Sequence, residues 1–170
     1  QLQALGCPAI GLSGADGNII LSEKRRGGTV DYGYAGDVIS VQAEQLQALL
    51  SAGLVPVCCA ITHDGQGQLL NTNADTIAAS LAAGLAPDYE VELQYCFEQP
   101  GVMRDIKDPA SLIPSLNPDS YAYFRANGVI VDGMVPKLDN AFRAVQAGAK
   151  RAVIADLAGL KSRIGTEVVD

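Results

Sequence analysis

The chain has 170 residues, of which 48% are hydrophobic and 18% are charged. This length suits a single domain, residues 1–170, and the composition is too apolar for a disordered protein. The 19 acidic and 12 basic residues leave a net charge of −7, which gives no positive field to attract nucleic acid or an anionic membrane. No apolar stretch reaches the roughly 20 residues that span a bilayer, so we expect a soluble protein with neither kind of partner.

The four cysteines, Cys7, Cys58, Cys59 and Cys96, do not form a C-x-x-C pair. Neither a zinc site nor a disulfide framework is indicated, and reduced thiols are typical of the cytoplasm. The first five residues, Gln-Leu-Gln-Ala-Leu, contain no signal-peptide pattern. We therefore expect a cytoplasmic protein.

Apolar periodicity and turn residues predict the secondary structure. In chain order, we first expect strands over 9–13 and 19–21, joined as a hairpin at Asp16-Gly17, and then a helix with Leu46, Leu49 and Leu50 on its inner face. A strand over 55–61 follows, joined as a hairpin to 69–70 at Asp64-Gly65, and then a helix over 76–81 and a strand over 89–97. The last elements are a helix over 119–127, a helix that begins near Pro136 and a strand over 152–155.

An Ala-Gly pair recurs at 52–53, 83–84 and 147–148, each time between a helical stretch and a β-rich run. Glycine at these points suits the left-handed residue that ends many helices. Helices that alternate with nearly continuous apolar strands predict an α/β layered fold.

Several common site motifs are absent from the sequence. There is no G-x-x-x-x-G-K-[ST] loop, and Leu70 stands where a dinucleotide fingerprint beginning at Gly65 would need its third glycine. Residues 11–14, Gly-Leu-Ser-Gly, do not form a G-x-S-x-G nucleophile elbow. The single histidine, His63, lies beside a turn, and we expect it to be a surface residue.

A polar segment, Asn71-Thr72-Asn73-Ala74-Asp75-Thr76, joins the strand at 69–70 to the next helix. Alternation along an extended chain would place Asn71 and Asn73 on one side, with Asp75 at the helix N-terminus. Two amides and a carboxylate would then converge. The alternative is purely structural: Asp75 caps the helix and the asparagines form a turn.

A second segment, residues 128–137, runs from an apolar stretch through Gly133 and Met134 to Pro136 and Lys137. A lysine at a helix start opposes the helix dipole, whose N-terminal end favours anions. A phosphate or carboxylate ligand would resolve this conflict. A lysine that simply extends into water is the alternative.

These two segments, together with Val-Asp-Tyr-Gly-Tyr-Ala-Gly-Asp-Val at 30–38, resemble the acetylglutamate kinases of the amino-acid kinase family. The family's N-x-N-A-D matches residues 71–75, its G-M-x-P-K matches 133–137, its first strand and turn match 11–17, and its closing strand matches Gly165-Thr166. The resemblance implies a three-layer α/β/α sandwich with a mainly parallel sheet. It also implies a cytoplasmic homo-oligomer that acts in arginine biosynthesis.

The reaction implied by the resemblance is transfer of the γ-phosphoryl group of ATP, with Mg²⁺, to the side-chain carboxylate of an N-acylglutamate. Lys137 would stabilise the transferring group, Asp75 would hold the catalytic lysines, and Asn71 and Asn73 would bind the acylglutamate. The residues expected to bind the nucleotide are Glu98, Gly101, Val129, Val131, Gly133 and Met134. A carboxylate acceptor is already ionised at neutral pH, so the reaction requires no general base.

The sequence departs from the family pattern, and two of the departures bear directly on the site. It has no counterpart of the family's K-x-G-G loop, which carries another catalytic lysine, so we expect the 170 residues by themselves to be inactive. Residues 96–101, Cys-Phe-Glu-Gln-Pro-Gly, stand where many relatives have T-D-V-x-G, and Glu98 could replace the aspartate. Two alternatives remain open: a non-catalytic binding module of the same fold, or a kinase of that fold with another substrate.

Overall fold

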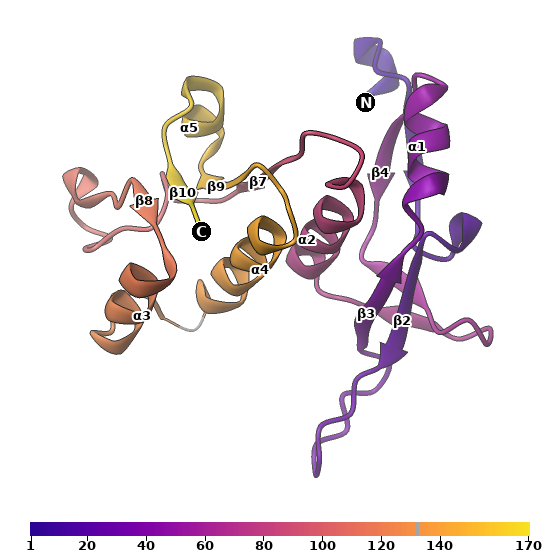
Figure 1. The fold of residues 1–170 in the computed structure, drawn as a ribbon, viewed down its shortest axis with the longest axis horizontal. Helices are drawn as coiled ribbons and strands as arrows, with labels where there is room; N and C mark the ends of the chain where they lie inside the picture. The colour runs from indigo at the N-terminus through magenta and orange to yellow at the C-terminus, as the bar shows by residue number, and fades with distance from the viewer. Residues whose placement is uncertain (132) are drawn as a thin grey trace. The chain divides into compact units, whose positions relative to one another are not determined.

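The computed structural model describes residues 1–131 and 133–170, which fold as two compact units, residues 1–84 and 85–170 (Figure 1). Each unit has its own strands, helices and buried core. The prediction of a single domain over residues 1–170 is not tested by this division and stays a prediction.

The first unit contains two separate sheets. Its elements are β1 (Ala9–Leu12), β2 (Ile20–Lys24), β3 (Gly36–Val41), α1 (Ala43–Ser51), β4 (Val55–Cys58), β5 (Ile61–His63), β6 (Leu69–Asn71) and α2 (Ala74–Leu85). Strands β1 and β4 pair in parallel, and the other sheet has the order β3-β2-β5-β6. Ile20, Leu70 and Ile77 are buried in this unit.

The strand pairing corrects two expectations. The hairpin predicted at Asp16-Gly17 is wrong, because β1 pairs with β4, whereas β2 pairs with β3 and β5. The predicted strand over 55–61 is divided into β4 and β5, which belong to different sheets; the hairpin at Asp64-Gly65 is confirmed for β5 and β6. His63 is not a surface residue, since it is buried and its Nδ1 accepts a hydrogen bond from the Gly65 amide.

Helix ends follow the predicted Ala-Gly pairs at two of the three places. Gly53 and Gly148 have φ values of +75° and +105°, as expected for residues that end a helix. Gly84 instead lies inside α2, and a β-carbon there would come within 3.1 Å of Val41 Cγ1. Its small size lets the helix pack closely against β3, so the predicted helix end at 83–84 is wrong.

The second unit is built around one sheet, with strand order β7-β9-β10-β8. Its elements are β7 (Glu92–Cys96), β8 (Ser115–Leu116), α3 (Pro118–Ala126), α4 (Val135–Gln146), β9 (Arg151–Ala155), α5 (Leu157–Ser162) and β10 (Thr166–Val168). One buried row crosses all its strands: Leu93, Ala152, Val168 and Leu116. Helix α4 packs against β9 and β10 (Figure 1).

The predicted fold class is confirmed. Helices alternate with strands in both units, and four of the seven strand pairings among the described residues are parallel. Within the described part of the chain, no helix combines the length and the apolar character that crossing a membrane requires.

Candidate active site

The Asn-Thr-Asn segment continues β6 into the start of α2. Asn71 and Asn73 are exposed while Thr72, between them, is buried, so the two amides lie on the same side of the extended chain as predicted. The backbone N–H of Asn71 donates to the Tyr34 carbonyl at 2.8 Å. This bond places the Asp-Tyr-Gly-Tyr segment, residues 31–34, beside the asparagines.

Thr72 anchors this segment in the interior. Its hydroxyl lies 2.9 Å from that of Thr62 and 3.2 Å from the Gly36 carbonyl, to which it donates. A β-carbon at Gly36 would lie 2.8 Å from both Leu70 Cβ and Thr72 Oγ1. Close packing beneath the asparagines therefore explains the glycine at position 36.

The N-terminus of α2 is capped by Asn73. Its Oδ1 accepts a hydrogen bond from the Thr76 amide at 3.1 Å, which satisfies one of the free N–H groups of the first turn. Asp75 is half-buried in that turn, where a negative charge is favourable. The structural alternative assigned the capping role to Asp75, whereas the oxygen that accepts from the Thr76 amide belongs to Asn73.

The Gly-Leu-Ser-Gly segment ends β1 in a tight turn. Asp16 Oδ2 accepts hydrogen bonds from the Ser13 amide at 2.6 Å and from the Ser13 hydroxyl at 2.7 Å. These bonds lower the pKa of Asp16 below its ordinary value of 3.8, the amide bond having the larger effect. The Gly14 amide donates to the Ile61 carbonyl at 2.6 Å, so this turn is attached to β5.

In the second unit, Lys137 lies in the first turn of α4, where Pro136 also stands, as predicted. The residue is only 9% exposed. The alternative of a lysine that extends into water is therefore wrong. A buried cation at a helix N-terminus is costly unless other groups stabilise its charge.

Two aromatic rings lie at the ammonium of Lys137. Its Nζ is 4.7 Å from the centre of the Tyr95 ring and 5.6 Å from that of Phe97. Both distances fall within the range in which the negative face of a ring attracts a cation. Sequence reasoning missed Tyr95 and Phe97; the signal available was their spacing of two on a strand, which places both side chains on one face.

The residues expected to bind a nucleotide lie on two loops of the second unit. On the first loop, Glu98 is exposed, whereas Gly101 is buried. A β-carbon at Gly101 would come within 2.6 Å of Thr166 Oγ1 and 2.7 Å of Leu112 Cδ1, so packing alone requires glycine there. The second loop leads into α4 and holds the remaining four: Val129 and Met134, which are half-exposed, and Val131 and Gly133, which are exposed.

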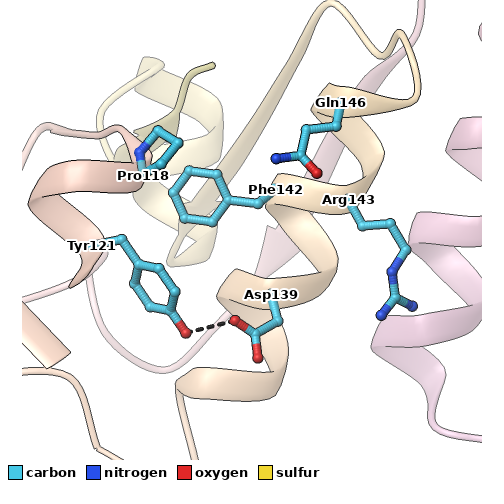
Figure 2. Close-up of a pocket in the computed structure, with 6 residues that line it drawn as sticks. All are labelled: Pro118, Tyr121, Asp139, Phe142, Arg143 and Gln146. Carbon is cyan, nitrogen blue, oxygen red and sulfur yellow. Dashed lines mark hydrogen bonds between the residues drawn. The ribbon is translucent and has the colours of Figure 1, made fainter.

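Side chains of helices α3 and α4 line an open pocket of about 290 Å³, and these residues are drawn in Figure 2. The Tyr121 hydroxyl donates to Asp139 Oδ1 at 2.6 Å, and the Tyr121 and Phe142 ring centres are 5.2 Å apart. Asp139 follows Lys137 by two residues and so lies on the other side of the helix. None of the residues lining this pocket is among the predicted site residues.

Comparison with known proteins decides the family. The model of the amino acid kinase family matches residues 1–156. The chain belongs to this family. It is 47% identical to the acetylglutamate kinase of Cytophaga hutchinsonii over 99% of this chain and 67% of the relative, and 49% identical to that of Phocaeicola vulgatus over 98% and 65%. The chain thus spans about two thirds of the length of these curated relatives.

Solved structures of low sequence identity share the fold. The protein smu.665 of Streptococcus mutans superposes with a TM-score of 0.83 at 23% identity, over 99% of this chain and 63% of that chain. A Giardia carbamate kinase gives 0.67 at 12% identity, over 99% and 65%. The predicted amino-acid kinase fold and the family resemblance are both confirmed.

The predicted site residues fall into two groups. Asn71, Asn73 and Asp75 come together at the start of α2 in the first unit, and Lys137 lies with its two rings in the second. Among the described residues, no cluster of three or more His, Cys, Asp or Glu side chains is placed to hold a metal ion. The roles assigned to these residues stay predictions.

Proposed function

We propose that this chain carries part of the active site of an ATP-dependent kinase that phosphorylates the side-chain carboxylate of N-acetylglutamate or another N-acylglutamate. The observation that most supports this is the buried ammonium of Lys137 at the N-terminal turn of α4. The chain's high identity to proteins named acetylglutamate kinase supports the same proposal. The proposal includes a cytoplasmic, homo-oligomeric enzyme of arginine biosynthesis.

The proposed chemistry needs cations rather than a base. A carboxylate oxygen of the substrate attacks the γ-phosphorus, the bond from that phosphorus to the bridging oxygen breaks, and ADP leaves as the acyl phosphate forms. No proton is transferred, because the attacking carboxylate is ionised at neutral pH. Negative charge spreads over the three equatorial oxygens in the transition state, where a fixed cation stabilises it.

Each group of residues has a role in this proposal. The Lys137 ammonium faces the transferring phosphoryl group, and the exposed amides of Asn71 and Asn73 bind the acylglutamate. Asp75 holds the catalytic lysines in position. The residues that bind the nucleotide in this proposal are Glu98, Gly101, Val129, Val131, Gly133 and Met134. Mg²⁺, bound with ATP, would neutralise part of the charge on its β- and γ-phosphates.

The test is Lys137→Met in the whole protein, with Lys107→Met as the matched control, because Lys107 is an exposed lysine of the same unit. We expect kcat for N-acetylglutamate phosphorylation to fall by on the order of 10²-fold or more with little change in KM, since the charge acts mainly in the transition state. Lys107→Met should leave kcat unchanged. Equal kcat for the two variants would contradict the proposal.

A further inference from the structure

The ammonium of Lys137 lies in an aromatic environment that the family motifs do not describe. Its Nζ is 4.7 Å from the Tyr95 ring centre and 5.6 Å from the Phe97 ring centre. Lys137 is 9% exposed and Tyr95 is 5% exposed, so little water reaches the contact. Removal from water strengthens the attraction between a cation and a ring face.

The sheet fixes the position of both rings. Tyr95 lies in β7, on the face that also carries the buried Leu93. The Phe97 amide donates to the Ala155 carbonyl at 2.8 Å, so the β7–β9 pairing continues one residue beyond Cys96. Phe97 therefore stays in register with Tyr95, and its ring faces the same side of the sheet.

Helix α4 fixes the other partner. Leu138 and Ala141 of this helix are completely buried, and the helix packs against β9 and β10. The backbone of Lys137 is thus held against the same sheet whose strand β7 carries the rings. The lysine side chain spans from a fixed helix to fixed rings, which restricts its rotamers.

We infer that Tyr95 and Phe97 are positioning residues for Lys137 in phosphoryl transfer. This inference rests on the proposed function. A ring attracts an ammonium group but has no net charge, so it orients the cation without cancelling its charge. The two rings therefore hold the ammonium without adding negative charge of their own, at a helix end that by itself repels a cation.

The decisive variant is Phe97→Leu in the whole protein, because Phe97 is only partly buried and leucine retains an apolar side chain. We expect kcat to fall by about 5- to 30-fold, with the KM for N-acetylglutamate and for ATP within about two-fold. Phe97→Tyr keeps the ring and should restore kcat to within about two-fold. Tyr95→Leu and Tyr95→Phe form a second pair with the same expected difference.

A second measurement detects the contact between Lys137 and the two rings and does not depend on enzyme activity. In protein labelled with ¹³C at lysine Cε, the ring currents of Tyr95 and Phe97 should shift the Lys137 ε-protons upfield of those of the exposed Lys107 and Lys161. Phe97→Leu should move the Lys137 signal back toward the signals of Lys107 and Lys161. The Lys137 signal is assigned by its absence from the Lys137→Met variant. This readout is independent of whether the lysine is catalytic.

The outcomes separate the inference from the proposed function. If Phe97→Leu leaves both kcat and the ε-proton signal unchanged, the rings do not position Lys137. If it raises the KM for ATP and leaves kcat unchanged, Phe97 binds the nucleotide, and the inference is wrong. If Lys137→Met leaves kcat unchanged while the ε-protons are shifted upfield, the ring contact exists but the proposed function fails.

Discussion

The hydroxyl groups of Thr62 and Thr72 lie 2.9 Å apart in the interior of the first unit. Thr72 also donates to the Gly36 carbonyl at 3.2 Å. One buried hydroxyl thus connects β5, the start of β3 and the segment that carries the two exposed asparagines.

We predict that Thr72→Val destabilises the protein by about 1 to 3 kcal/mol, because the change leaves a buried carbonyl and a buried hydroxyl with fewer partners. Thr72→Ser, which keeps the hydroxyl, should cost less. Denaturant unfolding of both variants is the measurement. A valine variant as stable as the serine variant would show that the hydroxyl is dispensable.

Gly36 offers a prediction about packing. Gly36→Ala should destabilise the protein by about 1 to 3 kcal/mol, because its β-carbon would lie 2.8 Å from Leu70 Cβ and from Thr72 Oγ1. Gly11→Ala is the matched control, since a β-carbon there meets nothing within 4 Å. Thermal unfolding should separate the two; equal midpoints would contradict the close packing at Gly36.

Asn73 combines a structural role with a predicted binding role, and two variants separate them. Asn73→Asp keeps the oxygen that caps α2, so stability should be unchanged, but it adds a negative charge where we expect an anionic substrate. The KM for N-acetylglutamate should rise. Asn73→Ala should cost about 1 kcal/mol of stability through loss of the cap. An unchanged KM for the aspartate variant would leave Asn73 with the capping role only.

Asp75→Asn tests the predicted role of Asp75 in holding the catalytic lysines. We expect kcat to fall while the melting temperature changes little, because the cap of α2 belongs to Asn73. Steady-state kinetics and thermal unfolding of the same sample provide both readouts. Normal turnover with a lowered melting temperature would reduce Asp75 to a stabilising charge at a helix end.

Tyr121 gives a prediction about pH. Its pKa is raised from 10 to about 12, first because burial disfavours the phenolate and then because the hydroxyl donates to Asp139. A raised pKa means that the stability this group contributes is complete below pH 10 and is lost as the pH rises through about 12. Ultraviolet titration of tyrosinate should show a late transition that Tyr121→Phe removes. Asp139→Asn should move that transition to lower pH.

The sequence predicted the helices and strands better than it predicted which strands pair with each other. The helices near Pro136 and over 119–127 are confirmed as α4 and α3, because each depends on local periodicity and end signals. The hairpin at Asp16-Gly17 was wrong because a turn dipeptide between apolar runs does not say which strands pair. Strand β1 pairs instead with β4, which lies more than forty residues away along the chain, as the register Ala9 to Val55 shows.

In the candidate site too, local features were predicted from the sequence and contacts between distant elements were not. Local spacing predicted that Asn71 and Asn73 share one side and that Lys137 begins a helix. It could not predict that Lys137 is buried, because burial depends on β7, which is about forty residues earlier in the chain. The rings of Tyr95 and Phe97 had no motif to reveal them, since cation–ring contacts have no fixed sequence separation.

Gly101 has a practical consequence for mutational scanning of this protein. Every other residue at this position would place a β-carbon against Thr166 and Leu112, so a scan that selects for activity should deplete all substitutions there through misfolding. Depletion at this position would therefore give no information about whether Gly101 contacts a nucleotide. Glu98, three residues earlier and exposed, is free of that packing constraint, so the pattern of tolerated residues at Glu98 is the one that reports on ligand contact.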